Sequence, residues 1–279
     1  MSKKNNLSFN IFAITLLIAF SILLIAPFIW MISVSLERYA NLQPPFPPSL
    51  IPQEPSMFNY KLVIENGTLF KAYANSFIIA FFTVLTTLFT ALLGGYAFSK
   101  GTFKGKKILF FLVLGTMMIP LESRLIPMYM MFSAWNMSNT FFPLVLTMPQ
   151  LGFAVLLSKQ YFDNLPNTIR EAAWIDGATE YKIFNKIFLP LSGPMIATLI
   201  ILIFMGSWND FLWPLIVLTS QKLQTIPIYL SKFSLEDGTA YAGLSMALSA
   251  SSIVPVIIVF LIFQRYIIES VAMSGIKGE

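Results

Sequence analysis

Long apolar runs without a single charge constrain this chain more than any other feature of its sequence. Residues 5–36 contain no Asp, Glu, Lys or Arg, and neither do residues 72–99. Because about 20 apolar residues of helix span the hydrocarbon core of a bilayer, each run is long enough to cross a membrane. Inside that core the backbone has to satisfy its own hydrogen bonds, which a helix does within one segment. The chain is therefore predicted to be an all-α membrane protein.

Six transmembrane helices are predicted. Their approximate limits, in chain order, are 5–36, 72–99, 108–121 with a continuation beyond 125, 141–157, 194–218 and 244–264. Lys and Arg of short loops stay on the cytoplasmic side. With both ends inside, twelve of the 18 basic residues lie on that side and six on the other. The N- and C-termini are therefore predicted to be cytoplasmic, and the basic excess requires no nucleic-acid partner.

Composition excludes several kinds of site. The chain has no Cys and no His, which excludes thiol nucleophiles, disulfides, zinc-type sites and a Ser-His triad. Charged residues make up 11% of the chain, against roughly 25% in an ordinary soluble domain. A metal-free, membrane-embedded protein without catalytic residues is expected.

Two segments outside the membrane are long enough to matter. Residues 37–70 are predicted to be extracytoplasmic, and their six prolines between Pro44 and Pro55 favour an extended loop over a helix. Residues 159–190 are predicted to be cytoplasmic and carry eight charges in an otherwise apolar protein. The second segment holds most of the functional information.

The cytoplasmic segment predicts two short helices that meet at a glycine. Thr168 and Glu171 fit the capping box S/T-x-x-E, and Pro166 prevents an earlier start, so a helix is expected from Ile169. Gly177 is expected to end it in the left-handed conformation. The residues alone leave two interpretations open: an amphipathic loop on the membrane surface, or a helix that inserts into a protein groove.

A second amphipathic stretch follows. Its apolar residues recur at helical spacing and are expected to share one face: Tyr181, Phe184, Ile187 and Phe188. Pro190 and Pro194 then interrupt the helix ahead of the fifth span. Together the two helices are expected to form a compact projection on the cytoplasmic side.

This segment resembles the EAA signature of type I ABC importer permeases, which reads E-A-A, three residues, G, nine residues, I, one residue and L-P. The residues in that register are Glu171, Ala172, Ala173, Gly177, Ile187, Leu189 and Pro190. The stretches "GSWNDFLWPL" and "FQRY" are similar to the carbohydrate-uptake branch of the family, the maltose-permease-like inner-membrane subunits. The resemblance covers about residues 75–277 and implies the type I ABC importer transmembrane fold.

The resemblance implies a transport mechanism. In that family the loop forms a coupling helix that docks on a separate ATP-hydrolysing subunit, and closure of two such subunits swings the membrane helices between inward-open and outward-open states. Glu171 would be the polar anchor of the docking. Ala172 and Ala173 would be small enough for close contact, since a bulky side chain would hold the helix out of its socket. Gly177 would be the bend.

The docking segment implied by the resemblance extends beyond that bend. Asp176, Ala178 and the following helix, with Ile187 and Leu189, would form a lever joined to the fifth span through Pro190. The implied regions are the cytoplasmic N-terminus and first span (1–36), the extracytoplasmic loop (37–70), the permease core (71–265) with its EAA loop (159–190), and the cytoplasmic tail (266–279).

The resemblance also implies partners and a location. The partners are a second homologous permease subunit, two ATP-binding subunits, an extracytoplasmic solute-binding protein and membrane lipid, in a bacterial cell membrane that this chain crosses several times. The chain contains no G-x-x-x-x-G-K-S/T sequence, so ATP and Mg are expected to be used by the partner subunits. No cofactor, no metal and no catalytic residue are expected on this chain.

Ionisable residues at membrane depth are candidates for a cargo pathway, because burying them in lipid is costly. Asp210 is one, and its neighbours Trp208, Asn209 and Trp213 add polar and aromatic groups that suit a sugar. Counted along a helix from Pro194, Asp210 is expected about 24 Å along it, near the outer end. An interfacial aromatic belt is the alternative interpretation of these four residues.

Glu122 and Arg124 are further pathway candidates. Pro120 and Pro127 bracket them, so the outer end of the third span is predicted to be broken or capped there. Many carbohydrate permeases have uncharged residues at this point, so the substrate preference does not transfer simply.

Import of a carbohydrate is the function that the sequence and its resemblance favour. The first alternative keeps the machinery and changes the cargo to glycerol-3-phosphate or a related polyol phosphate. A membrane-embedded enzyme would need paired carboxylates at one depth, yet Asp210 is the only acid well inside spans four to six. An ion channel would need rings of filter groups that have no counterpart in this sequence.

Overall fold

The computed structural model describes residues 7–42, 49–65, 68–233 and 241–276. Lys3, Lys4, the first four prolines of the Pro-rich segment and the last three residues of the predicted tail lie outside these ranges. Pro52 and Pro55 lie in non-helical backbone, as predicted. Just after them, the segment predicted to be a loop contains one short helix that the sequence pattern did not indicate.

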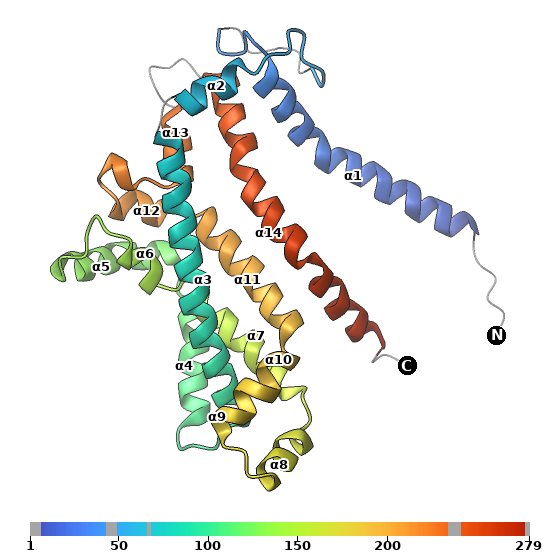
Figure 1. Ribbon diagram of the computed structural model, residues 1–279, viewed down its shortest axis with the longest axis vertical. Helices are drawn as coiled ribbons and strands as arrows, with labels where there is room; N and C mark the ends of the chain where they lie inside the picture. Colours follow the sequence, from blue (N-terminus) through green and yellow to red (C-terminus); the bar gives the residue numbers. More distant parts are fainter. Residues whose placement is uncertain (1–6, 43–48, 66–67, 234–240, 277–279) are drawn as a thin grey trace. The chain divides into compact units, whose positions relative to one another are not determined.

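The regular structure of the described residues is helical throughout (Figure 1). The helices are α1 (Leu7–Leu36), α2 (Phe58–Glu65), α3 (Thr68–Lys100), α4 (Lys106–Met118), α5 (Leu121–Ala134), α6 (Phe142–Leu146), α7 (Leu151–Asp163), α8 (Asn167–Ile175), α9 (Glu180–Ile183), the π-helical η1 (Phe184–Phe188), α10 (Leu189–Leu191), α11 (Gly193–Trp208), α12 (Leu212–Val217), the 3₁₀ turn η2 (Gln221–Leu223), α13 (Ile226–Phe233) and α14 (Ala242–Ile276).

By length and composition, four helical stretches can cross a membrane unaided. They are Phe9–Leu36, Thr68–Lys100, Phe142–Asp163 and Ala242–Tyr266. Two bent pairs add to them: α4 with α5, bent by 102°, and the α9–α10 stretch with α11, bent by 77°. Counting each pair as one broken span gives up to six spans in the described residues, which agrees with the predicted number.

The chain divides into two compact units. The first comprises residues 1–70 and 229–254, and the second comprises residues 71–228 and 255–279. Each is described by itself. The second unit contains α4 to α12 and most of α3, and therefore all the residues predicted to act in docking or in the cargo pathway.

In the first unit, a fully buried asparagine holds the loop after α1 in place. Asn59 on α2 donates hydrogen bonds to the carbonyl oxygens of Ser35 (3.0 Å) and Glu37 (2.9 Å). The Glu37 carboxylate accepts from the backbone N–H groups of Gln53 (2.6 Å) and Glu54 (3.2 Å). The end of α1, the loop and α2 are thus one hydrogen-bonded assembly.

In the second unit, α3 and α7 approach each other closely through small residues. A Cβ atom added at Gly95 would collide with the side chain of Ser158 and would lie 2.9 Å from the backbone nitrogen of Lys159. Lipid is as apolar as the side chains, so helices in a membrane associate through close packing rather than through the hydrophobic effect. The close approach at Gly95 therefore contributes to the cohesion of this unit.

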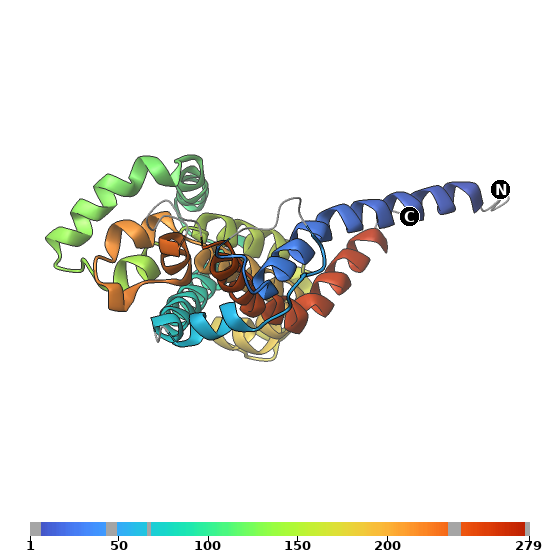
Figure 2. The same ribbon diagram turned by 90° about the horizontal axis from the view of Figure 1, so that it is seen from above.

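The third predicted span is broken where its prolines predicted a break. α4 ends at Met118, α5 begins at Leu121, and Pro120 lies in extended backbone between them. Figure 2 views α4 nearly along its axis, while α5 runs across the picture. Pro127 lies inside α5 and does not end it.

The fifth span is shorter than predicted, so the prediction of one helix over 194–218 was wrong. α11 ends at Trp208 and α12 begins at Leu212. In one continuous helix, Pro214 would deprive the carbonyl oxygen of Asp210 of its donor and would clash with it. In the first turn of a new helix a proline is tolerated, so the break falls ahead of it. Asp210 therefore lies in a connection and not on a helix.

We expect Gly95→Ala to lower stability by about 1–3 kcal/mol, because the added methyl group would push α3 away from α7. Gly115→Ala is the matched control: this residue is also in a helix, but a Cβ atom there would meet nothing within 4 Å. The measurement is thermal unfolding of the detergent-purified chain by circular dichroism. Equal unfolding temperatures for the two variants would contradict the close-packing interpretation.

Candidate functional site

Helix α8 ends as its glycine predicted. Gly177 has φ +76°, in the left-handed region. Its N–H donates to the carbonyl oxygen of Trp174 (3.0 Å), and the N–H of Ala178 donates to that of Ala173 (2.9 Å). These two bonds form a Schellman motif, which satisfies carbonyl groups that the helix end leaves free. The chain therefore reverses sharply between α8 and α9.

The start of α8 differs from the prediction. The helix begins at Asn167, and no side chain caps its N-terminus, so the predicted capping box was wrong. Pro166, with φ −59°, directly precedes the helix. Its fixed φ and missing N–H suit that position, so the helix starts two residues early. Thr168 and Glu171 consequently lie within the helix.

The two faces of α8 have different environments. Ala173 is buried and packs in the apolar cluster of the second unit, beside Phe162 and Phe184. The residues spaced i, i+3, i+4 and i+7 on the opposite side are all exposed: Thr168, Glu171, Ala172 and Ile175. Ile175 is 86% exposed, which is unusual for a large apolar side chain. We call these four residues the outer face of α8.

This arrangement separates two residues that the sequence pattern paired. Ala172 and Ala173 were both predicted to allow close docking. Ala172 lies on the outer face, whereas Ala173 points into the chain. The small size of Ala173 therefore serves packing within this chain. Asp176, at the end of α8, is exposed.

The second predicted helix is present as α9, η1 and α10. Phe184 and Phe188 are buried as expected, but Tyr181 is 77% exposed, so the predicted apolar face was wrong at that residue. Ile183 is buried in its place. The π-helical segment η1 has a wider turn than an α-helix, which shifts the faces of the residues before it relative to those after it.

The end of this stretch joins α11. Ile187 and Leu189 are partly buried against the apolar cluster, while Pro190 is exposed. α11 begins at Gly193 after the 77° bend, so the predicted interruption near Pro190 and Pro194 is confirmed.

A charged network joins α8, α9 and α3. The Arg170 guanidinium donates to Oε1 of Glu180 through Nη2 (2.6 Å) and Nε (2.9 Å). The hydroxyl of Tyr96, on α3, donates to Oε2 of the same carboxylate (2.7 Å). Burial disfavours the charge of Arg170, but its bonds to Glu180 and the charge of Glu180 outweigh burial, so the pKa of Arg170 is raised. We call Tyr96, Arg170 and Glu180 the Glu180 network.

Lys100, at the end of α3, holds the start of α8. Its Nζ donates to the carbonyl oxygen of Leu165 (2.8 Å) and to Oδ1 of Asn167 (2.7 Å). The same ammonium lies 5.7 Å from the centre of the Phe188 ring. Figure 1 shows α8 and α9 at one end of the second unit, by the end of α3.

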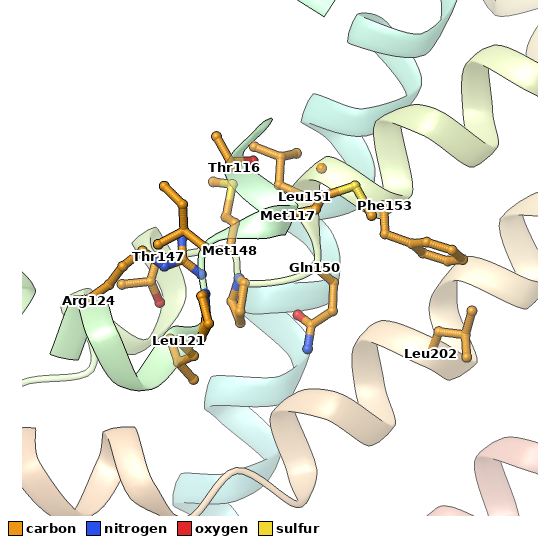
Figure 3. A pocket seen from close by; sticks show the side chains of 14 residues that line it. Thr116, Met117, Leu121, Arg124, Thr147, Met148, Gln150, Leu151, Phe153 and Leu202 are labelled. Atoms are coloured by element: carbon orange, nitrogen blue, oxygen red, sulfur yellow. The ribbon is translucent and has the colours of Figure 1, made fainter. Parts of the chain in front are cut away.

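A second candidate site is an open cavity of about 630 Å³ that is lined by residues of the second unit. It lies where α4 gives way to α5 and where α6 gives way to α7, so irregular backbone lines it. Its polar lining consists of Thr116, Arg124, Thr147 and Gln150 (Figure 3). Non-helical backbone at membrane depth is tolerated where it lines a water-filled cavity, which fits a transport pathway.

Two polar atoms of this lining have no partner in the described part of the chain. They are Nε of Arg124 and Oε1 of Gln150, both buried. The first residues of α5 and α7 also line the cavity, so the positive ends of two helix dipoles face it. The cavity therefore offers hydrogen-bond donors and positive potential to a hydroxyl-rich or anionic molecule.

The pathway candidates do not gather at one place. Only Arg124 lines this cavity, and Glu122 is exposed. Trp208 is buried and packs against the rings of Tyr73 and Phe204. Asn209 is exposed.

Trp213 and Asp210 have structural contacts. Trp213 is buried, and its indole N–H donates to the carbonyl oxygen of Pro143 (3.2 Å). Asp210 is partly buried and accepts from the backbone N–H of Trp213 (3.4 Å), a contact at the start of α12. Neither the aromatic pair nor Asp210 lines the cavity.

Sequence reasoning missed four residues that the structure places in these sites. Tyr96 and Glu180 are 84 residues apart, and no local spacing links them. Lys100 ends an apolar run, which indicated only the membrane boundary. Gln150 follows Pro149 inside an uncharged stretch, and this polar residue next to a helix breaker was the available signal for the cavity.

No group of three or more acidic residues that could hold a metal ion occurs in the described ranges. ATP binding likewise has no sequence motif on this chain.

Comparisons with known proteins agree with this geometry. Residues 88–272 match the family of "Binding-protein-dependent transport system inner membrane component". The chain is 38% identical to the arabinooligosaccharides transport system permease protein AraQ of Bacillus subtilis over 230 residues, 81% of each chain. It is 35% identical to the trehalose/maltose transport system permease protein MalG of Thermococcus litoralis, over 94% of this chain and 95% of that one.

A solved structure has the same fold. It is a bacterial ABC transporter involved in the import of the acidic polysaccharide alginate, and it matches with a TM-score of 0.83 and 24% identity. The match covers 96% of this chain and 99% of the other. The fold of the described residues is therefore that of an ABC importer permease.

Exchanging the two alanines for leucine should separate the two faces of α8. We expect Ala173→Leu to cost about 1–3 kcal/mol of stability, because the larger side chain overpacks the apolar cluster. Ala172→Leu is the matched control, one residue away and exposed, and should leave stability within about 0.5 kcal/mol of the wild type. Thermal unfolding in detergent measures both. The reverse order of unfolding temperatures would mean that α8 presents its other face.

Proposed function

The chain belongs to the family of binding-protein-dependent transport system inner membrane components, and from that premise we propose that it is the permease subunit of an importer for a carbohydrate and that α8 docks on an ATP-hydrolysing partner. The chain is a multi-pass component of the inner membrane and a transport subunit, not an enzyme. A solute-binding protein outside the membrane belongs to such a system.

The outer face of α8 is the observation that carries the docking proposal. It combines an exposed apolar side chain, Ile175, with a small residue, Ala172, and a carboxylate, Glu171. A helix with this face exposed to water would gain free energy by entering a groove on another protein. Glu171 makes no ion pair in the described part of the chain, so its carboxylate is available to a donor on the partner.

The lever in this proposal is the α9–α10 stretch. Force on α8 passes through the Schellman turn at Gly177 into α9, and from there across the bend into α11. Ile187 and Leu189 pack against the apolar cluster, so the stretch moves with its neighbours rather than freely. Nucleotide-driven closure of two partner subunits would then tilt α11 and open the pathway to one side or the other.

The partners follow from the same proposal. They are two ATP-binding subunits, a second homologous permease, the extracytoplasmic solute-binding protein and the surrounding lipid. ATP and Mg would be used in the ATP-binding subunits, because this chain contains no phosphate-binding loop.

The cargo we propose is a sugar or oligosaccharide. AraQ is named as an arabinooligosaccharide permease and MalG as a trehalose/maltose permease. These names favour a carbohydrate over a polyol phosphate. The cavity is consistent with such a cargo, because Arg124, Gln150 and two threonines offer hydrogen-bonding groups that sugar hydroxyls can use. The candidates Trp208, Asn209, Asp210, Trp213 and Glu122 lie elsewhere, and we assign Arg124 to the pathway ahead of them.

Affinity purification of the tagged chain from mild detergent, followed by an ATPase assay, tests the docking proposal. We expect a second permease and an ATPase to co-purify with the wild type. Glu171→Ala, Ala172→Leu and Gly177→Pro should each reach the membrane but release the ATPase or uncouple it. Gln160→Ala, at an exposed residue of α7, is the control. Normal uptake and full ATPase recovery in all three variants would remove the docking assignment.

Arg124→Gln should reduce carbohydrate uptake by about tenfold while the complex still assembles, because a charged donor to a cargo hydroxyl contributes about 1.5–3 kcal/mol. Glu122→Gln, two residues away and outside the cavity lining, is the matched control and should transport like the wild type. Uptake of radiolabelled arabinooligosaccharide or maltose by cells measures both variants. Equal uptake by the two variants would exclude the cavity as the pathway.

A further inference from the structure

Helix α8 follows α7 directly, after residues 164–166, and is joined to the membrane part of the chain by two further routes. One is covalent and leads through Gly177, α9, η1 and α10 to α11, and it contains a left-handed turn, a π-helical segment and a 77° bend. The second route is non-covalent and leads to α3. Contacts from α3 reach α8 at its start, through Lys100, and one turn further on, at Arg170, through the Glu180 network.

The contact at the start of α8 is short and buried. Lys100 is 8% exposed, which is unusual for a lysine. Its two hydrogen bonds, to the carbonyl oxygen of Leu165 and to Oδ1 of Asn167, offset part of the cost of burying the ammonium. Both acceptors lie on the connection into α8 or on its first residue, so the position of α8 depends on the end of α3.

The second contact fixes α8, α9 and α3 to one carboxylate. Both oxygens of Glu180 are used, Oε1 by Arg170 of α8 and Oε2 by Tyr96 of α3. The Arg170 guanidinium also lies 4.1 Å from the centre of the Trp174 ring, which holds it on its own helix. Charge-assisted bonds of this kind are about twice as strong as neutral ones.

Tyr96 is itself held rigidly. Its ring lies 5.1–5.7 Å from the ring centres of Phe162, Phe184 and Phe188, which come from α7 and η1. A hydroxyl on a ring packed on several sides has little freedom to follow a moving acceptor. If Glu180 moves, either the hydrogen bond breaks or α3 moves as well.

α3 is suited to carry such a movement. It is a single helix of 33 residues without proline, and it is long and apolar enough to cross a membrane. A continuous α-helix transmits displacement along its axis with less bending than a route through a turn and a 77° bend. The contact with α7 at Gly95 and Ser158 adds a second stiff element beside it.

We propose that α8, α9 and the adjoining end of α3 move as one rigid body, so that docking of α8 drives the α3 span directly as well as α11. Tyr96, Glu180 and Lys100 are the positioning residues of this body. The inference rests on the proposed function, since it presumes that α8 docks on an ATP-hydrolysing partner.

The first test is the amount of cargo transported per ATP hydrolysed by the purified complex in proteoliposomes. Tyr96→Phe removes one hydroxyl and keeps the packed ring, and Lys100→Met removes the charge but keeps a long side chain. We expect each variant to hydrolyse ATP at close to the wild-type rate and to lower cargo per ATP by about tenfold, the value of one lost bond to a charged group.

The matched control for both variants is Ser99→Ala. Ser99 also lies at the end of α3 and also donates to a carboxylate of another helix, Oδ1 of Asp163 on α7 (2.7 Å), but it does not contact α8. Cargo per ATP should stay at the wild-type value in this variant. Wild-type cargo per ATP in Tyr96→Phe and Lys100→Met, or an equal fall in Ser99→Ala, would overturn the inference.

The second test measures the rigid body itself. The chain has no cysteine, so Phe89→Cys on α3 and Lys182→Cys on α9, both exposed, place two spin labels at unique positions on it. We expect their distance distribution to be the same in the nucleotide-free and the vanadate-trapped complex, and to broaden when Tyr96→Phe is added. A change of distance between the two states in the otherwise wild-type chain would overturn the inference.

The two proposals fail in different ways. If the complex takes up cargo with ATP and the positioning variants keep the wild-type value of cargo per ATP, the proposed importer function stands. The rigid-body inference is then overturned. A wild-type chain that binds no ATPase and shows no ATP-driven uptake would overturn the proposed function, and this inference with it.

Discussion

Backbone hydrogen bonding in a medium without water is the constraint on which the rest of this structure depends. A helix meets it residue by residue, and each interruption has to be satisfied by other groups. In the second unit side chains take this role where the helices stop. The side-chain oxygen of Asn139 accepts from the backbone N–H groups of Thr219 and Ser220, and the Asn75 side chain donates to the carbonyl oxygens of Lys222 and Gln224.

The interruptions that remain are the functionally interesting ones. The break between α4 and α5 and the one between α6 and α7 both face the cavity, where buried polar atoms of Arg124 and Gln150 have no partner among the described residues. A permease needs such groups, because a hydrophilic cargo has to exchange its hydration for protein contacts on the way through. In the function that we propose, the two helix breaks at membrane depth would serve the transport of the cargo.

The docking region that we propose would solve a different physical problem, the transfer of force between a soluble partner and membrane helices. Small and charged residues share this work. Ala173 lets α8 pack closely on its own chain, while Ala172 keeps the outer face flat. Glu180 binds groups from α8 and α3 at once, so in the proposed mechanism a displacement of α8 would reach more than one span. Local packing and long-range coupling therefore depend on the same few contacts.

The sequence by itself determined the features that depend on neighbours along the chain. Uncharged runs located the first, second and sixth spans to within a few residues, Pro120 predicted the break after α4, and Gly177 predicted the left-handed end of α8. Each of these follows from local sterics or from the length of an apolar segment. The start of α8 was predicted two residues too late. The capping-box pattern indicated Ile169, whereas Pro166 fits directly before a helix that begins at Asn167.

Only the tertiary structure decided which side of each helix meets which neighbour. The buried position of Ala173, the exposed Tyr181 and the bond between Tyr96 and Glu180 depend on contacts between segments far apart in the chain. The cavity likewise exists because two separate helix breaks lie at one place. Sequence spacing describes one helix at a time, whereas these features arise from the packing of several.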